Sequence, residues 1–557
     1  MSAPVERERY PRSPLPVLKD RDPHEDEDLL FLFLSEDQVF LKLTRTCNNI
    51  CSFCCDTVFW NGTHMEAERV YAKIREGAAK GLKRLFLSGG EPTIHPDFIR
   101  FVHLGRTLGY DQIITITNGR MFFYEEFARK SVRAGLSEVI FSLNSHDEKT
   151  HDALVGVKGA YQQVVKGIAN VRALGCPFRM NVVVTRKNFE QLAPMVRAYH
   201  TLGARSATFL QLVPNDRDWE RSRNSIYYET ELGRQAVRDA LHVARELEFP
   251  VEFKKFPDNF FEDFEEHIPE PVGWALELAE IDWRRPDRHE PYKRGGAVKC
   301  WGERCAYCAY RPFCTHLMAH RETRTAARFD GFALDARRSV APSFADALAR
   351  QPEAPIRVAA PDAASAAPVL AEHAKRPRSL QLDSLAGVDS VPAEVGLVVG
   401  SAEALEAVAA LPNPIEVELN VDTVRWLEAH HDWVIARGAA LGVFPQVFLR
   451  LEAARRGQVE LDRVFRALPL AEAHLTNIPA CLSGRRESAR ARTFVDETLL
   501  REVEDVPAHA QHFYFERYLT KSDRCRECRL YDACDGVHIN YVRQFGYRTL
   551  RPIKGEP

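Results

Sequence analysis

The sequence predicts an α/β fold built on a parallel sheet, because short apolar runs rich in β-branched residues alternate with longer stretches of helical apolar spacing. Strands that alternate with helices imply right-handed βαβ units. Six runs are expected to be strands: Val39–Leu43, Arg84–Ser88, Gln112–Thr117, Glu138–Asn144, Arg179–Thr185 and Ala207–Leu212. The expected helices between them are Met65–Lys80, Pro96–Leu108, Tyr124–Ala134, Tyr161–Leu174 and Phe189–Leu202.

Length and composition are those of a globular protein with more than one domain. The chain has 557 residues, of which 45% are hydrophobic and 27% charged, which suits two to four domains with substantial cores. Its formal net charge of −3 argues against the broad basic face that nucleic-acid binding usually requires. A nucleic-acid partner is therefore disfavoured.

The N-terminus lacks the features of an export signal or a membrane anchor. Residues 1–28 are rich in Pro, Arg, Asp and Glu, have no apolar core, and are expected to be disordered. The apolar run Leu29–Leu34 is far shorter than the roughly 20 residues that span a bilayer. Thirteen cysteines without an export signal favour a reducing, cytoplasmic location and metal binding over disulfides.

Three cysteines follow the first expected strand on one short loop: Cys47, Cys51 and Cys54. Disulfides need even numbers, and a structural zinc ion would need a fourth ligand nearby. Soft thiolates select zinc or iron–sulfur clusters, and three ligands leave one iron of a cubane open. The loop therefore favours an iron–sulfur cluster, with a structural metal loop or a chance spacing as the alternative.

A second motif makes this loop resemble a known family. CxxxCx(aromatic)C, with Phe53 as the aromatic residue, is followed after the next strand by Gly89-Gly90-Glu91-Pro92. Together these motifs resemble the radical S-adenosylmethionine (radical SAM) superfamily. The resemblance implies a partial (β/α)6 radical SAM barrel over residues 29–250, a 4Fe-4S cluster that binds S-adenosyl-L-methionine, and an electron donor of flavodoxin or ferredoxin type.

The polar residues at the strand ends acquire expected roles from this resemblance. In barrels of parallel strands, chemistry sits at the carboxyl ends of the strands. Gly89 and Gly90 are expected to let backbone approach the cofactor, and Glu91 to oppose its ammonium group. The other expected contacts are Phe53 with the adenine, Ser142 and Asn144 with the ribose, and Arg186 with the carboxylate. Ordinary strand-end capping is the alternative for Ser142 and Asn144, and no catalytic residue is assigned.

The cysteines return twice after the expected barrel. Residues 251–322 contain Cys300, Cys305, Cys308 and Cys314, and residues 521–557 contain Cys525, Cys528 and Cys534. Both groups include the pattern Cx2Cx5C, 220 residues apart. Upstream, Phe256-Pro257-Asp258-Asn259 matches Ile478-Pro479-Ala480-Cys481, so Cys481 is the expected fourth ligand of the last group.

This repeat predicts the organisation of the last third. Residues 323–378, rich in Ala, Pro and Arg, are expected to be a linker, and residues 379–520 a shortened, degenerate copy of the second half of the barrel. Its expected strands are Leu380–Leu382, Val395–Val399, Ile415–Leu419 and Gln446–Leu451. Because it has no CxxxCxxC, this copy is not expected to bind the cofactor.

The two later cysteine groups resemble the SPASM and twitch extensions of radical SAM enzymes, which implies one or two auxiliary 4Fe-4S clusters. The match is partial, because Asn259 replaces a cysteine in the first group and neither group continues into a further Cx3C. Structural zinc is the alternative for both groups. Cys55 and Cys176 remain over and are expected to be small buried side chains.

The sequence thus favours an enzyme that oxidises or cross-links an unactivated C–H position, most plausibly on a ribosomally made peptide. Auxiliary clusters would give an electron somewhere to go after hydrogen abstraction. Modification of a small metabolite or a tRNA is the alternative. A non-catalytic iron–sulfur carrier is disfavoured, because a carrier has no need of the Gly-Gly-Glu-Pro loop.

Overall fold

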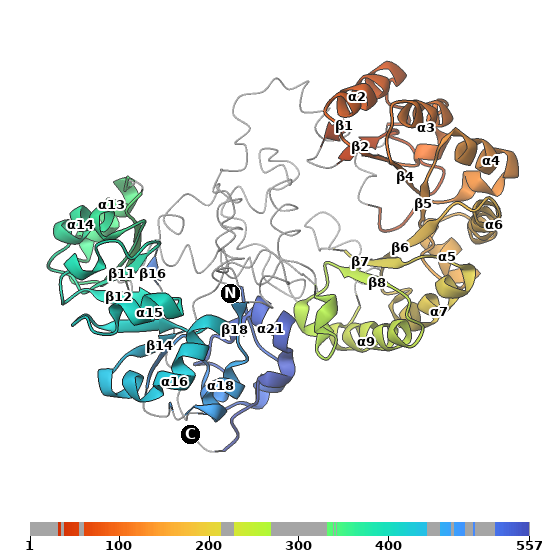
Figure 1. Cartoon of the computed structure of the whole chain (residues 1–557). Coiled ribbons are helices and arrows are strands. Elements are labelled where there is room, and N and C mark those ends of the chain that lie inside the picture. Colours follow the sequence, from red (N-terminus) through yellow and green to blue (C-terminus); the bar gives the residue numbers. More distant parts are fainter. Residues whose placement is uncertain are drawn as a thin grey trace. The chain divides into compact units, whose positions relative to one another are not determined.

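A computed structural model describes most of the chain, which divides into two compact units. The described residues are 32–34, 38–54, 61–212, 228–268, 331–337, 339–340, 342–442, 457–468, 470, 473–484, 494–495 and 518–555. We call residues 17–260 with 302–309 the N-terminal unit, and residues 1–16, 261–301 and 310–557 the C-terminal unit (Figure 1). The expected disordered segment 1–28 lies outside the described residues.

The N-terminal unit is built on one sheet whose strands follow chain order from β1 to β8. The first strand is antiparallel to the second, and every later pair is parallel. The strands are β1 (Leu32–Leu34), β2 (Gln38–Lys42), β3 (Arg84–Ser88), β4 (Gln112–Thr117), β5 (Glu138–Phe141), β6 (Phe178–Val184), β7 (Ala207–Gln211) and β8 (Val251–Lys254). All six expected strands are confirmed, and β8 extends the parallel part of the sheet beyond them.

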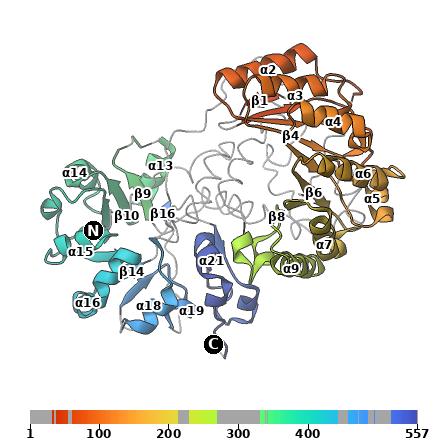
Figure 2. The ribbon, with the colours of Figure 1, turned by 45° about the vertical axis from the view of Figure 1, so that its right-hand side comes forward.

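Helices cover one face of this sheet in both views of the molecule (Figures 1 and 2). They are α2 (Ala67–Ala79), α3 (Phe98–Thr107), α4 (Glu125–Ala134), α5 (Glu148–Val155), α6 (Ala160–Ala173), α7 (Leu192–Leu202) and α9 (Thr230–Glu246). Buried and half-buried residues alternate along β6, as expected for strands with only one face against helices. On β3, for example, Leu85 and Leu87 are fully buried, whereas Phe86 between them is half-buried.

The C-terminal unit repeats this architecture with an all-parallel sheet. Seven of its strands follow chain order, as β2 to β8 do, and β16 (Phe494–Val495) adds to the edge of β9. They are β9 (Gly331–Asp335), β10 (Ile356–Ala360), β11 (Arg378–Leu382), β12 (Gly396–Val399), β13 (Ile415–Glu418), β14 (Ala440–Gly442) and β15 (His474–Thr476). The helices are α13 (Pro342–Arg350), α14 (Ala363–Glu372), α15 (Ala402–Val408), α16 (Val421–Arg437), α18 (Leu461–Ala467) and α19 (Ala480–Ser483).

Two expectations for this region are wrong. The expected linker 323–378 contains β9, α13, β10 and α14. The described repeat also matches all seven parallel strands of the N-terminal sheet rather than its second half. The composition was misleading because Ala363, Ala366 and Leu370 of α14 are buried: small side chains let this helix pack closely. The expected strand Gln446–Leu451 lies outside the described residues.

The end of the chain forms a small separate element. β17 (Leu519–Thr520) pairs with β18 (Val537–His538), and between them a 3₁₀ turn, η12 (Asp523–Glu527), carries Cys525. Helix α21 (Ile539–Phe545) follows and contacts η6 (Glu265–His267), a 3₁₀ turn of the same unit. In the described part of the chain, no helix is long and apolar enough to cross a membrane.

Candidate functional site

The first cysteine loop follows β2 and brings three thiols together. Cys47, Cys51 and Cys54 are each half-buried. Burial raises the pKa of Cys47 to about 11. Burial, followed by the charges of Cys54 and Cys47, raises the pKa of Cys51 to about 12. The thiols of Cys47 and Cys51 therefore favour the protonated form, and binding a metal must release these protons.

Residues after β4 and at the end of α5 hold this loop in place. The Arg120 guanidinium, after β4, donates to the Asn48 carbonyl and, at 3.2 Å, to the Asn49 side chain. The Ile50 amide donates to the Val155 carbonyl of α5 at 2.9 Å. The loop is therefore held by a side chain that follows β4 and by the backbone of α5.

Two N–H groups point at the Cys47 sulfur. The Asn49 amide donates at 3.4 Å and the Asn118 side-chain amide at 3.8 Å. Hydrogen bonds to ligand sulfurs are one means by which proteins set the potential of an iron–sulfur cluster. Neither Asn118 nor Arg120 was predicted to contact the cluster or the cofactor, although both closely follow the end of β4, a position that could have indicated them.

Gly89 and Gly90 allow the loop after β3 to lie against the cysteine loop. Gly89 has a φ of +116°, and a Cβ on Gly90 would lie 2.0 Å from the Thr46 carbonyl oxygen. The Gly90 amide donates to the Thr44 carbonyl at 3.0 Å. The expected close approach therefore exists, but in this structure it is to the chain's own backbone.

Glu91 is 1% exposed, and its carboxylate accepts several hydrogen bonds from the protein. It accepts hydrogen bonds from the Thr93 amide at 3.1 Å, the Thr117 hydroxyl at 2.6 Å, the Asn118 amide at 2.8 Å, and the Thr93 hydroxyl. Three of these donors share Oε1, and only the Asn118 amide binds Oε2, so Oε2 keeps an acceptor position. Glu91 ties the loops after β3 and β4 together, and its contact with an ammonium group stays a prediction.

The residues expected at the ribose lie after β5 in different environments. Asn144 is 2% exposed, and its side-chain oxygen accepts from the Val183 amide at 2.9 Å, which is the capping contact that we considered as the alternative. The backbone amide of Asn144 donates to Nδ1 of the buried His151 at 3.2 Å. Ser142 and Phe53 are half-buried, and Arg186 is exposed.

The last four cysteines come together in the C-terminal unit. Cys481 lies in α19, Cys525 in η12, and Cys528 and Cys534 after it. Burial raises the pKa of Cys481 to about 12, with further contributions from Cys534, Cys525 and Cys528. The four thiols therefore lie within electrostatic reach of one another. Their role as ligands stays a prediction, and a set of four thiols suits a four-iron cluster.

Hydrogen-bond donors also reach this second set of sulfurs. The Gly536 amide donates to Cys534 and the Ile553 amide to Cys528, both at 3.4 Å. Among the described residues, no three His, Cys, Asp or Glu side chains are arranged to hold a single metal ion. A cluster spaces its thiolates more widely, because each sulfur binds a different iron. Cys300, Cys305, Cys308 and Cys314 lie outside the described residues.

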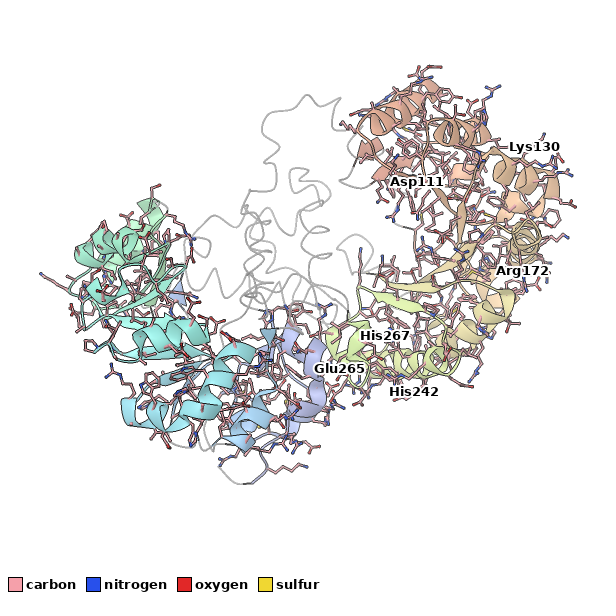
Figure 3. All side chains as sticks on the ribbon, in the orientation of Figure 1. Asp111, Lys130, Arg172, His242, Glu265 and His267 are labelled. Carbon is pink, nitrogen blue, oxygen red and sulfur yellow. The ribbon has the colours of Figure 1, made fainter. Side chains whose placement is uncertain are left out.

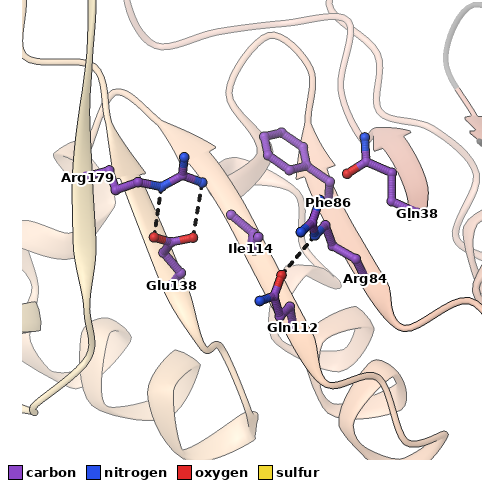
Figure 4. A pocket seen from close by; sticks show the side chains of 7 residues that line it. All are labelled: Gln38, Arg84, Phe86, Gln112, Ile114, Glu138 and Arg179. Atoms are coloured by element: carbon purple, nitrogen blue, oxygen red, sulfur yellow. Dashed lines mark hydrogen bonds and ion pairs between the residues drawn. The ribbon is translucent and has the colours of Figure 1, made fainter. Parts of the chain in front are cut away.

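A polar pocket of about 320 Å³ lies at the amino ends of strands in the N-terminal unit (Figure 4). Arg179 pairs with Glu138 through two bonds of 2.8 and 3.1 Å, and Arg84 donates to Gln112 at 2.8 Å. Gln38, Arg84, Gln112 and Glu138 are the first residues of their strands. This pocket is therefore distinct from the cysteine loop, which follows the last residue of β2.

Comparison with known proteins places the first site in a family. Residues 41–198 match the Radical SAM superfamily. A probable GTP 3′,8-cyclase of Saccharolobus solfataricus is 29% identical over 176 residues, 31% of this chain and 56% of the relative. An AdoMet-dependent heme synthase of Methanosarcina barkeri is 29% identical over 178 residues, 32% of this chain and 50% of the relative.

Solved structures show weaker similarity. Streptococcus suis SuiB bound to the precursor peptide SuiA has 16% identity and a TM-score of 0.35, over 44% of this chain and 54% of that one. Native anSMEcpe with bound AdoMet and the Kp18Cys peptide has 14% identity and a TM-score of 0.33, over 38% and 61%. The chain spans about half the length of the curated relatives that it matches. The matched segment contains both the cysteine loop and the Gly-Gly-Glu-Pro loop: residues 41–198 are a radical SAM domain.

Proposed function

We propose that this chain is a radical SAM enzyme that oxidises or cross-links a C–H position of a peptide. The observation that carries the enzymatic part is the joining of two loops. The backbone amides of Gly90 and Glu91 donate to the carbonyls of Thr44 and Thr46, at the start of the loop that presents Cys47, Cys51 and Cys54. When bound, a 4Fe-4S cluster and S-adenosylmethionine supply a 5′-deoxyadenosyl radical that abstracts a substrate hydrogen atom.

The chain's own residues would bind and orient these cofactors. Cys47, Cys51 and Cys54 are the proposed cluster ligands. Ser142 and the side-chain N–H groups of Asn144 are proposed to bind the ribose, since the oxygen of Asn144 is already engaged by Val183. Phe53 is proposed to pack beside the adenine and Arg186 to contact the carboxylate. Glu91 is proposed to fix the loops around the cofactors and to oppose the ammonium group through the acceptor position that Oε2 retains.

The four cysteines of the C-terminal unit support the oxidative part of the proposal, because they could hold a second cluster. Removal of a hydrogen atom followed by net oxidation leaves one electron to be carried away, and a cluster held by Cys481, Cys525, Cys528 and Cys534 can accept it. A further cluster at Cys300, Cys305, Cys308 and Cys314 remains part of the proposal. A flavodoxin- or ferredoxin-type donor would supply the electron that starts the reaction.

A small-molecule substrate is the second candidate. The relatives that match the radical SAM domain at 29% identity are named as a GTP 3′,8-cyclase and a heme synthase, which act on small molecules according to their names. This observation concerns only the matched segment. A small metabolite therefore remains the alternative to a peptide as the substrate.

Turnover of the cofactor tests the proposed activity. Anaerobically reconstituted, dithionite-reduced protein should convert S-adenosylmethionine to 5′-deoxyadenosine, slowly even without a substrate. Formation of S-adenosylhomocysteine alone would instead indicate methyl transfer. Substrate class is tested by deuterium transfer into 5′-deoxyadenosine from a uniformly deuterated candidate, with a peptide encoded by a neighbouring gene in one arm and nucleotides or porphyrin precursors in the other.

A further inference from the structure

A buried carboxylate of the C-terminal unit reaches the loop that carries Cys525. Glu262 lies eight residues after Lys254, the last residue of β8, and is 4% exposed. Its side chain accepts from the Ser522 hydroxyl at 2.7 Å, the Asp523 amide at 3.2 Å and Arg524 Nε at 2.8 Å. The loop that contains Cys525 is therefore anchored to a residue 260 positions upstream of Ser522.

These contacts determine where the turn with Cys525 begins. Ser522 is the N-cap of η12 and is 2% exposed, and its hydroxyl accepts from the Arg524 amide at 3.1 Å while donating to Glu262. Hydrogen bonds to a charged acceptor are stronger than neutral ones. Glu262 thus holds the start of the turn by three charge-assisted bonds.

A second carboxylate on the same segment binds a more distant part of the tail. Glu265 accepts from the Tyr547 amide at 2.8 Å and from the Asp263 amide at 3.2 Å, and η6 contacts α21 (Figure 3). Glu265 therefore anchors the tail without touching the turn that carries Cys525. It serves as a matched control for Glu262.

The carboxylate of Glu262 lies against the start of the turn that carries Cys525, where it also forms an ion pair with Arg524 at 2.8 Å. Its negative charge, which Arg524 offsets in part, would oppose any added electron at a cluster bound there, because like charges repel more strongly in a partly buried site than in water. Glu262 therefore has two effects to separate, one on geometry and one on charge.

We propose that Glu262 is a positioning residue for the four-cysteine site of Cys481, Cys525, Cys528 and Cys534. It holds the Cys525 turn ready to bind a cluster, and its charge makes that cluster harder to reduce. This inference rests on the cluster proposed above. A low potential would retain such a cluster in its oxidised form until a strongly reducing substrate radical is formed.

The test compares Glu262→Gln, Glu262→Ala and the control Glu265→Gln in the full-length protein after anaerobic reconstitution. Iron per chain, cluster midpoint potentials from spectroscopically monitored redox titration, and cleavage near residue 525 by a limiting protease are measured. Glu262→Gln keeps the shape and one oxygen acceptor but loses the charge. It should retain its iron and shift the potential of one cluster upward, with the cofactor-binding cluster unchanged.

Glu262→Ala should lose up to about four irons and be cut roughly tenfold faster near residue 525, because losing charge-assisted bonds makes local opening easier. Glu262→Gln should restore the iron, and Glu265→Gln should shift no potential. Wild-type iron and potentials in both Glu262 variants would overturn the inference. If Cys528→Ala loses no iron, the cluster itself is absent, and the inference falls together with that part of the proposed function.

Discussion

The Thr117 hydroxyl, at the end of β4, donates a 2.6 Å hydrogen bond to the buried carboxylate of Glu91 in the loop after β3. This bond links the ends of two neighbouring strands beside the cysteine loop. It gives Glu91 a structural role that a ligand contact would not, and the two roles predict different behaviour.

Replacement of Glu91 should lower the stability of the N-terminal unit even in the absence of the cofactors. Glu91→Ala leaves the Asn118 and Thr93 amides without an acceptor in a buried site, at a cost of about 1–3 kcal/mol each. Thr117→Val should lose a smaller part of the same free energy. Urea unfolding of the iron-free protein measures both. Wild-type stability together with weakened S-adenosylmethionine binding would instead support a direct ammonium contact.

Replacement of Cys47, Cys51 and Cys54 together by Ala should remove about four irons from the reconstituted protein, the content of one cubane. Iron and sulfide analysis checks this result. Cys176→Ala is the control, because Cys176 is buried in the same unit and its sulfur donates to the Leu136 carbonyl rather than facing the loop. Unchanged iron in the triple variant would exclude this loop as the cluster site.

The two later cysteine groups should differ in how much they support the fold. Cys528→Ala should remove about four irons and make the tail after residue 518 sensitive to protease, since metal binding stabilises segments with little core of their own. Cys308→Ala should be milder, because Asn259 stands where the later group has Cys481. Equal losses in both variants would mean that Cys300 completes the earlier group.

His151 should make the N-terminal unit less stable in mild acid. It is 1% exposed, and burial lowers its pKa to about 4 from an ordinary value of 6.5. Between these values the unfolded chain binds a proton that the folded chain does not. Stability should therefore fall as the pH decreases from 6.5 towards 4, by up to about 3 kcal/mol.

His151→Gln provides the comparison for this prediction. Glutamine can still accept from the Asn144 amide, as Nδ1 of His151 does now, but it does not titrate. Its melting temperature should vary less with pH than that of the wild type across the same range. Parallel pH profiles of the two proteins would show that folding does not lower the pKa of His151.

Sequence patterns predicted the N-terminal sheet well, because its strands are short apolar runs that alternate along the chain with stretches of helical apolar spacing. They also located the cysteine loop and the Gly-Gly-Glu-Pro loop at strand ends. They could not show which way the Glu91 carboxylate points, since that depends on donors from Thr117 and Asn118, which are distant in sequence. Position alone suggested a ligand contact, and the structure adds the internal contacts that the sequence did not predict.

The C-terminal unit was harder to predict for a different reason. Its helix α14 is rich in Ala and contains Pro368, a composition typical of linkers. Only packing distinguishes the two, and Ala366 is fully buried. The contacts of Glu262 could likewise not be predicted, because the local sequence around residue 262 does not indicate a contact with Ser522.

The pairing of β16 with β9 affects the order in which the protein can form during synthesis. In the N-terminal sheet each new strand meets a neighbour made just before it, so pairing can proceed as the chain leaves the ribosome. In the C-terminal sheet, Phe494 must return to Gly331 after all the strands between them. The hydrogen bond between Glu262 and Ser522 likewise cannot form until Ser522 has been translated. A ribosome paused before residue 494 would therefore carry a finished first sheet and an incomplete second one.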